Sequence, residues 1–153
     1  MKSLITLLVS LFSLSLFANE NISRLGLGVT QEAANDLPAI SFKVHFGEEG
    51  ALGGFFGYQS GDASKYAFGA KYYHTMISEP NLILSINALG ALINTGETTG
   101  FQASLNLGGE FLFEEFPHVG LSAEAGLSVV SMDSFTFQTN GLSIIKSALH
   151  FYF

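Results

Sequence analysis

The C-terminal stretch of this chain alternates between two kinds of side chain. Counted back from the last residue, one set consists of Phe153, Phe151, Leu149, Ser147 and Ile145. The set between them consists of Tyr152, His150, Ala148, Lys146 and Ile144. Successive side chains of a β-strand point to opposite faces of the sheet. This period therefore predicts a strand with one apolar face and one face that carries a lysine and a histidine.

Seven earlier segments have the same period, and stretches rich in turn-forming residues separate them. The eight predicted segments are about Ile22–Gln31, Ala39–Phe46, Ala51–Ser60, Lys65–Met76, Leu82–Asn94, Phe101–Phe113, His118–Val130 and Leu142–Phe153. The longest predicted loop is Ser131–Gly141. Most segments run 8–13 residues, and a tilted strand needs ~9–11 residues to cross a membrane. The segment lengths therefore suit membrane-crossing strands.

Polarity decides between a soluble sheet and a membrane sheet. In the second, sixth, seventh and eighth segments the polar residues share one face, and the other face is almost entirely apolar. Only 12% of the residues are charged, which is about half the usual fraction for a soluble domain. We therefore predict an all-β fold, an eight-stranded antiparallel up-and-down transmembrane β-barrel. An even number of strands places both ends of the barrel on the same side of the membrane.

Residues 1–18 are predicted to be a secretory signal peptide. Lys2 forms a basic start, Leu4–Phe17 is an apolar run, and Ala18 precedes a polar stretch. The alternative is an N-terminal membrane anchor, but a spanning helix needs ~20 apolar residues. The predicted organisation is a signal peptide at 1–18 and an outer-membrane β-barrel at 19–153. The absence of cysteine excludes disulfides, thiolate metal sites and a lipoprotein anchor.

An alternating final strand that ends on Phe153 resembles the C-terminal strand of bacterial outer-membrane β-barrels. The architecture predicted for residues 19–153 is similar to the small eight-stranded family typified by the OmpX-like and OmpA transmembrane-domain groups. The resemblance implies a place in the bacterial outer membrane, in contact with outer-membrane lipid. It also implies a barrel assembly machinery that reads the terminal aromatic residues Phe151 and Phe153. The external loops are short and Trp is absent, so the adhesion that long loops mediate is not carried over.

Charged residues of the mature chain are predicted to gather inside the barrel. The predicted barrel-interior charge network consists of Arg24, Lys43, Lys71, Lys146, Glu110 and Glu124. The interior of an eight-stranded barrel is just wide enough for side chains to fill. The simplest interpretation is a plug of salt bridges and hydrogen bonds. The alternative is a narrow anion-favouring pore, because the inward cations outnumber the inward carboxylates.

No catalytic or metal-binding arrangement emerges from the sequence. His118, Ser122 and Glu124 share the predicted inward face of the seventh segment, but His118 and Ser122 are ~13 Å apart along one strand. That distance is too long for the hydrogen bond that a serine nucleophile needs. His45 and His150 face inward on strands that are not neighbours, so no metal site and no cofactor are expected. No basic patch is present, so nucleic acid is not an expected partner.

Small residues are predicted to face lipid on three adjacent segments. They are Ala88, Gly90, Ala103, Gly109, Ala123 and Ala125. The simpler interpretation is that small residues ease the curvature of the barrel. The alternative is a homo-oligomer that packs through this strip, since small residues let surfaces approach closely.

The sequence therefore predicts a non-enzymatic structural outer-membrane β-barrel, with self-association into homo-oligomers as an extension of that role. One alternative is a small-solute, porin-like channel, which conductance in planar bilayers distinguishes. A less favoured alternative is a lipid-modifying outer-membrane enzyme, because no catalytic triad was found.

Overall fold

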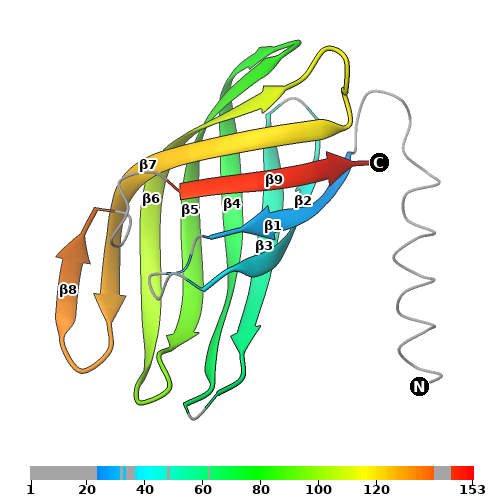
Figure 1. Ribbon diagram of the computed structural model, residues 1–153. Coiled ribbons are helices and arrows are strands. Elements are labelled where there is room, and N and C mark those ends of the chain that lie inside the picture. Colours follow the sequence, from blue (N-terminus) through cyan, green and yellow to red (C-terminus); the bar gives the residue numbers. More distant parts are fainter. Residues whose placement is uncertain (1–23, 32, 34–36, 48, 62, 140–145) are drawn as a thin grey trace.

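The chain folds into a single antiparallel sheet in the computed structural model (Figure 1), which describes residues 24–31, 33, 37–47, 49–61, 63–139 and 146–153. The strands within these residues are β1 (Leu25–Thr30), β2 (Ala39–His45), β3 (Gly50–Gln59), β4 (Lys65–Glu79), β5 (Leu82–Asn94), β6 (Thr99–Leu112), β7 (Val119–Ser131), β8 (Phe135–Gln138) and β9 (Lys146–Tyr152). The predicted signal peptide and residues 142–145 of the predicted final strand lie outside the described residues.

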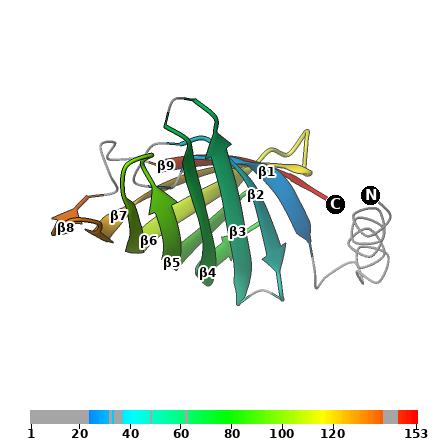
Figure 2. The same cartoon turned by 90° about the horizontal axis from the view of Figure 1, so that it is seen from below.

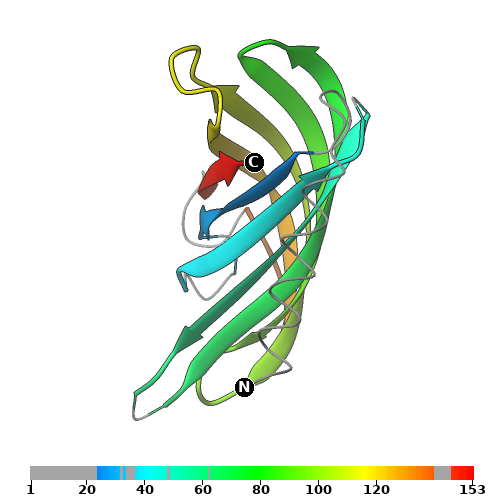
Figure 3. The same cartoon turned by 90° about the vertical axis from the view of Figure 1, so that its right-hand side faces the viewer.

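The sheet closes on itself. Each strand from β1 to β7 pairs with the next one along the chain, and β9 lies between β7 and β1. Phe151 of β9 faces Val119 on one side, and Tyr152 faces Gly26 on the other. The view in Figure 2 shows the strands arranged around a common axis, and Figure 3 shows β1 and β9 side by side. The predicted eight-stranded antiparallel up-and-down barrel is therefore confirmed, with one strand in addition.

The additional strand is β8, which lies inside the predicted loop Ser131–Gly141. It forms a hairpin with the last four residues of β7, whereas β9 pairs with the first six. The prediction of a strandless loop was wrong. The Phe-Thr-Phe-Gln segment does alternate, but four residues are too short to stand out as a strand between two turn-rich stretches.

The pairing registers determine how far the strands tilt. From Lys43 on β2, the register leads through β3, β4, β5 and β6 to Ser128 on β7. In the other direction it leads through β1 and β9 to His118, which directly precedes β7 and lies ten residues before Ser128. In an eight-stranded barrel, this stagger corresponds to strands tilted by about 40° from the barrel axis.

Side chains inside and outside the barrel have reversed polarity. Large apolar side chains on every strand of the closed barrel point outward and are exposed, for example Leu105 at 61% and Phe42 at 48%. The buried inward positions include Lys43, Lys71, Asn87, Gln102, Glu110, Glu124 and Lys146. The predicted alternation is therefore confirmed on both faces, with polar residues inside.

The interior divides into two layers along the barrel axis. We call the end where β1 begins and β9 ends the terminal end, and the other end the distal end. A buried apolar cluster occupies the distal half, and it consists of Ala33, Leu37, Ala39, Phe55, Ala67, Leu89, Ala91, Ile93 and Val130. Gly69 makes room for this cluster, because a Cβ at that position would lie 2.8 Å from the Phe55 ring. The charged residues lie nearer the terminal end.

Candidate functional site

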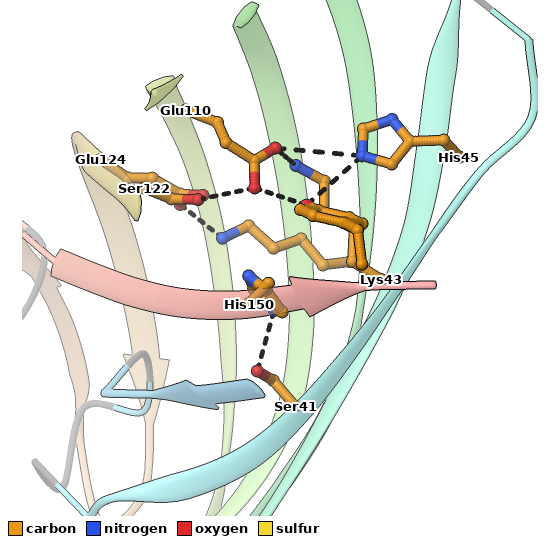
Figure 4. A network of polar contacts seen from close by, with 9 residues as sticks. Ser41, Lys43, His45, Glu110, Ser122, Glu124 and His150 are labelled. Atoms are coloured by element: carbon orange, nitrogen blue, oxygen red, sulfur yellow. Dashed lines mark hydrogen bonds and ion pairs between the residues drawn. The ribbon is translucent and has the colours of Figure 1, made fainter. Parts of the chain in front are cut away.

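Glu110, near the end of β6, is the centre of the buried charge cluster. Its side chain is 3% exposed, and Lys43 Nζ donates a hydrogen bond to Oε2 at 2.6 Å. Ser122 Oγ on β7 donates to Oε1 at 3.3 Å, and the Tyr152 hydroxyl on β9 donates to the same oxygen. In Figure 4, dashed lines join the Glu110 carboxylate to Ser122 on one side and to Lys43 and His45 on the other. The carboxylate thus has a cationic partner and two neutral donors, which a buried charge requires.

His45 extends this cluster toward the terminal end. Its Nε2 lies 3.9 Å from Glu110 Oε2 and 3.5 Å from the Tyr152 hydroxyl. The rings of His45 and Tyr152 are 5.5 Å apart between centroids. The last inward residue of the chain is therefore packed between a histidine and a carboxylate.

A second ion pair joins Lys71 of β4 and Glu124 of β7, both buried. The Tyr73 ring connects the two pairs, because Lys43 Nζ lies 4.4 Å and Lys71 Nζ 5.0 Å from its centroid. Such cation–π contacts are favourable and gain strength where water is excluded. Lys146 is buried on β9 directly opposite Glu124 in the register. The two ion pairs therefore form one continuous cluster across the barrel.

Five of the six residues in the predicted charge network are buried inside the barrel, and the sixth, Arg24, is exposed. Lys43, Lys71, Lys146, Glu110 and Glu124 are all buried inside the barrel. Arg24 was predicted to lie inside as well, but it is exposed immediately before β1. Its backbone carbonyl accepts a hydrogen bond from His45 N at 3.0 Å. Arg24 lies an even number of residues before the inward positions of β1. It precedes the first residue of that strand, however, and its side chain is exposed.

A buried Ser–His pair was not predicted from the sequence. Ser41 Oγ on β2 and His150 Nε2 on β9 are hydrogen-bonded at 2.9 Å. Both residues face Gly28 of β1, one on each side, and a Cβ at Gly28 would overlap the Leu149 carbonyl of β9, so the glycine allows β9 to approach β1 closely. His150 is 2% exposed and Ser41 is 9% exposed, so both partners are buried inside the barrel. The pair therefore serves to satisfy buried polar groups.

His118 is not part of an inward group on β7, contrary to the prediction. It precedes the strand and is exposed, and its Nδ1 donates to the Tyr152 carbonyl at 3.0 Å. Ser122 donates to Glu110, and Glu124 pairs with Lys71. The three residues that were considered as a catalytic group therefore have separate structural partners.

The predicted strip of small residues is not continuous. Gly90 lies opposite Ala103, and Gly109 lies opposite Ala123. Ala88, however, faces Leu105, and Ala125 faces Leu107; these leucines are 61% and 57% exposed. The prediction overlooked the intervening outward residues of β6. Two short rows remain, and the longer one continues through Ala70 to Gly54 on β3.

The terminal aromatic residues lie on the outer face. Phe151 and Phe153 are 51% and 67% exposed. The backbone N–H of Phe153 donates to the Leu25 carbonyl at 3.0 Å, which ties the end of the chain to the start of β1.

Comparison with models of protein families, with curated proteins and with solved structures finds no match for this chain. No group of three or more potential metal ligands occurs among the residues that the structure describes. The same residues contain no helix that is long and apolar enough to cross a membrane.

Proposed function

We propose that this protein is a non-enzymatic structural barrel of the bacterial outer membrane, similar to the small eight-stranded OmpX-like and OmpA transmembrane-domain family. The reversed polarity of the barrel carries the proposal. In water, exposed side chains such as Leu105, Phe42 and Phe151 would cost free energy, and buried lysines would gain nothing from being inside. In lipid the same arrangement is favourable, because the outer face meets hydrocarbon.

The spacing of exposed aromatic side chains supports this location. Phe101 and Phe111 are both exposed on β6, ten residues apart. At ~3.3 Å per residue and a tilt of about 40°, they are separated by roughly 25 Å along the barrel axis. That distance equals the height of the apolar band of an outer-membrane barrel, which aromatic residues border on both sides. Phe101 shares its row with Leu92, Phe68 and Phe56, so the distal aromatic belt has aromatic side chains on three of the four strands in this row.

The filled interior supports a structural role in preference to a channel or an enzyme. Ion pairs occupy the terminal half, and the apolar cluster occupies the distal half. A conducting pore would require these side chains to move apart. The buried Ser41–His150 pair offers no accessible nucleophile for a lipid substrate.

The proposal also covers export and assembly. Residues 1–18 would direct the chain across the inner membrane and be removed. The exposed Phe151 and Phe153 would be read by the barrel assembly machinery, as the resemblance implies. Phe151 lies in β9, Phe153 follows its last residue, and both side chains are exposed on the outer face of the barrel.

Refolding tests the proposal directly. Mature chain diluted from urea is expected to fold only when lipid vesicles or detergent micelles are present, because its exposed face is apolar. Folding is measured by far-UV circular dichroism and by the altered gel mobility of unboiled samples. The same chain in aqueous buffer is expected to aggregate. A folded, monodisperse species in buffer without lipid would show that the barrel is soluble.

Self-association is the second part of the proposal, now restricted to the row Gly54, Ala70, Gly90 and Ala103. Substituting phenylalanine for Ala103 is expected to reduce crosslinked dimers in vesicles at least several-fold, because a bulky ring prevents close approach. Substituting phenylalanine for Ala123, in the shorter row, is the matched control and should leave crosslinking unchanged. Equal crosslinking in both variants and in the unaltered protein would refute contact through this row and leave the membrane assignment standing.

A further inference from the structure

The hairpin of β7 and β8 carries two exposed aromatic side chains beside the closed barrel. Figure 1 and Figure 2 show β8 apart from the strands that close the barrel, and within the described part of the chain β8 pairs with β7 alone. Phe135 is 76% exposed and Phe137 is 66% exposed. No other large apolar side chain among the described residues is as exposed as Phe135. Exposed apolar side chains that lie together in this way mark an interaction site.

Both rings belong to the outer face of the sheet. Across β7, Phe135 shares its row with the exposed Phe101 of β6, and Phe137 shares its row with Ala103. Thr136 lies between the two rings on the opposite face, because successive side chains of a strand alternate. The hairpin is therefore amphipathic, and its apolar side continues the outer face of the barrel.

The register gives the level of the two rings along the barrel axis. At the tilt given above, each residue along a strand advances about 2.5 Å along the axis, and each step from β6 through β7 to β8 advances about 3 Å toward the distal end. Phe137 is two such steps beyond Ala103, which lies two residues from Phe101 on the side of the terminal end. Phe137 is therefore roughly level with Phe101, and Phe135 lies roughly 6 Å farther toward the distal end.

Two contacts hold the hairpin against the barrel at this level. A Cβ on Gly100 would overlap the Ser131 carbonyl oxygen and the Met132 side chain, so the glycine allows the turn of the hairpin to pack against β6. Asp133 in the turn accepts a hydrogen bond from Thr98 Oγ1 at 3.2 Å. The two rings therefore lie at the level of the distal aromatic belt.

Lipid fits this face better than a protein partner does. Two aromatic side chains bury roughly 300–500 Å² together, whereas a stable protein interface buries about 800 Å² on each partner. Aromatic side chains are enriched at the membrane–water interface, where an apolar ring meets lipid and its neighbours meet water. The outer edge of β8 also needs hydrogen-bond partners, which water and headgroups supply at that depth but hydrocarbon does not.

We propose that the hairpin of β7 and β8 is a membrane-interface anchor, in which Phe135 and Phe137 enter the lipid headgroup region beside the barrel wall. The inference rests on the proposed location of the barrel in a membrane. The anchor extends the lipid contact beyond the closed wall on one side of the distal end, and Thr136 faces water.

Single tryptophan substitutions test the anchor, because the chain contains no Trp. In the vesicle-refolded protein, the Phe137→Trp variant is expected to lose roughly half of its emission in lipid brominated near the headgroup, since aromatic side chains lie at that level. Lipid brominated near the chain ends should quench it less. The control variant Leu105→Trp, near the midplane, should show the opposite preference. The Thr136→Trp variant, on the other face of the hairpin, should be quenched by aqueous iodide.

Two results for the Phe137→Trp variant would overturn the anchor while bromine still quenches Leu105→Trp. One is quenching by iodide without quenching by either brominated lipid, which means that the ring lies in water. The other is short-wavelength emission that no quencher changes, which means that a second copy or another part of the protein covers the ring. If neither brominated lipid quenches Leu105→Trp, the membrane location itself is wrong, and the anchor fails with it. If the Phe137→Trp variant does not refold, Phe135→Trp provides the same readings.

Discussion

Substituting methionine for Lys43 is expected to lower the free energy of unfolding in lipid vesicles by about 3–5 kcal/mol, the usual cost of removing one partner from a buried ion pair. Lys43 Nζ is the 2.6 Å partner of Glu110, which is 3% exposed. Without it, the carboxylate retains only the Ser122 and Tyr152 hydroxyls as hydrogen-bond donors among the described residues, apart from the more distant His45. Urea titration followed by circular dichroism and tyrosine fluorescence measures the change, since the chain has no Trp.

Two further variants make this result specific. Methionine at Lys65, which lies at the distal end of β4 and is partly exposed, should change stability by less than about 0.5 kcal/mol. Combining methionine at Lys43 with glutamine at Glu110 should recover a large part of the loss, because no unpaired charge remains inside. A double variant no more stable than the Lys43 variant would contradict the ion-pair explanation.

Arginine in place of Leu105 is expected to destabilise the barrel in a bilayer by about 2–4 kcal/mol, the cost of a cation on the lipid face near the membrane midplane. Leu105 is 61% exposed and lies between the exposed Phe101 and Phe111 on β6. The measurement is the urea midpoint in vesicles of fixed lipid composition.

The depth of the substitution provides the control. Arginine in place of Phe101, in the distal aromatic belt, should cost only about 0–1 kcal/mol beyond the loss of the ring, because the charge reaches the interface. Similar penalties at both positions would mean that the outer face of β6 does not cross hydrocarbon. That result would remove the main support for the membrane assignment, whereas the Lys43 experiment would be unaffected.

The strands could be predicted from the sequence because the alternation of side chains is visible in neighbouring residues. The inward positions of Lys43, Lys71, Glu110, Glu124 and Lys146 follow from counting every second residue, and the structure buries all five. Counting fails where a strand has not begun or is very short. Arg24 directly precedes β1, His118 directly precedes β7, and both are exposed. The short strand β8 lies within a predicted loop.

Contacts across the barrel interior could not be predicted from the alternation of side chains. Lys43 and Glu110 are separated by 67 residues, on strands that are not neighbours in the sheet. Which lysine meets which carboxylate depends on the stagger that accumulates around the whole barrel. The same holds for Ser41 and His150, which meet because β9 closes against β1 and Gly28 allows the two strands to approach closely.

The amino-acid sequence by itself determined the fold class and the number of strands in the closed barrel. It also determined on which face of the sheet the polar residues within the strands lie, because the alternation is visible in neighbouring residues. Only the tertiary structure decided the pairing of charges, the division of the interior into two layers and the interruption of the small-residue strip by Leu105 and Leu107. Those features depend on register, and register is set when all eight strands of the barrel close together.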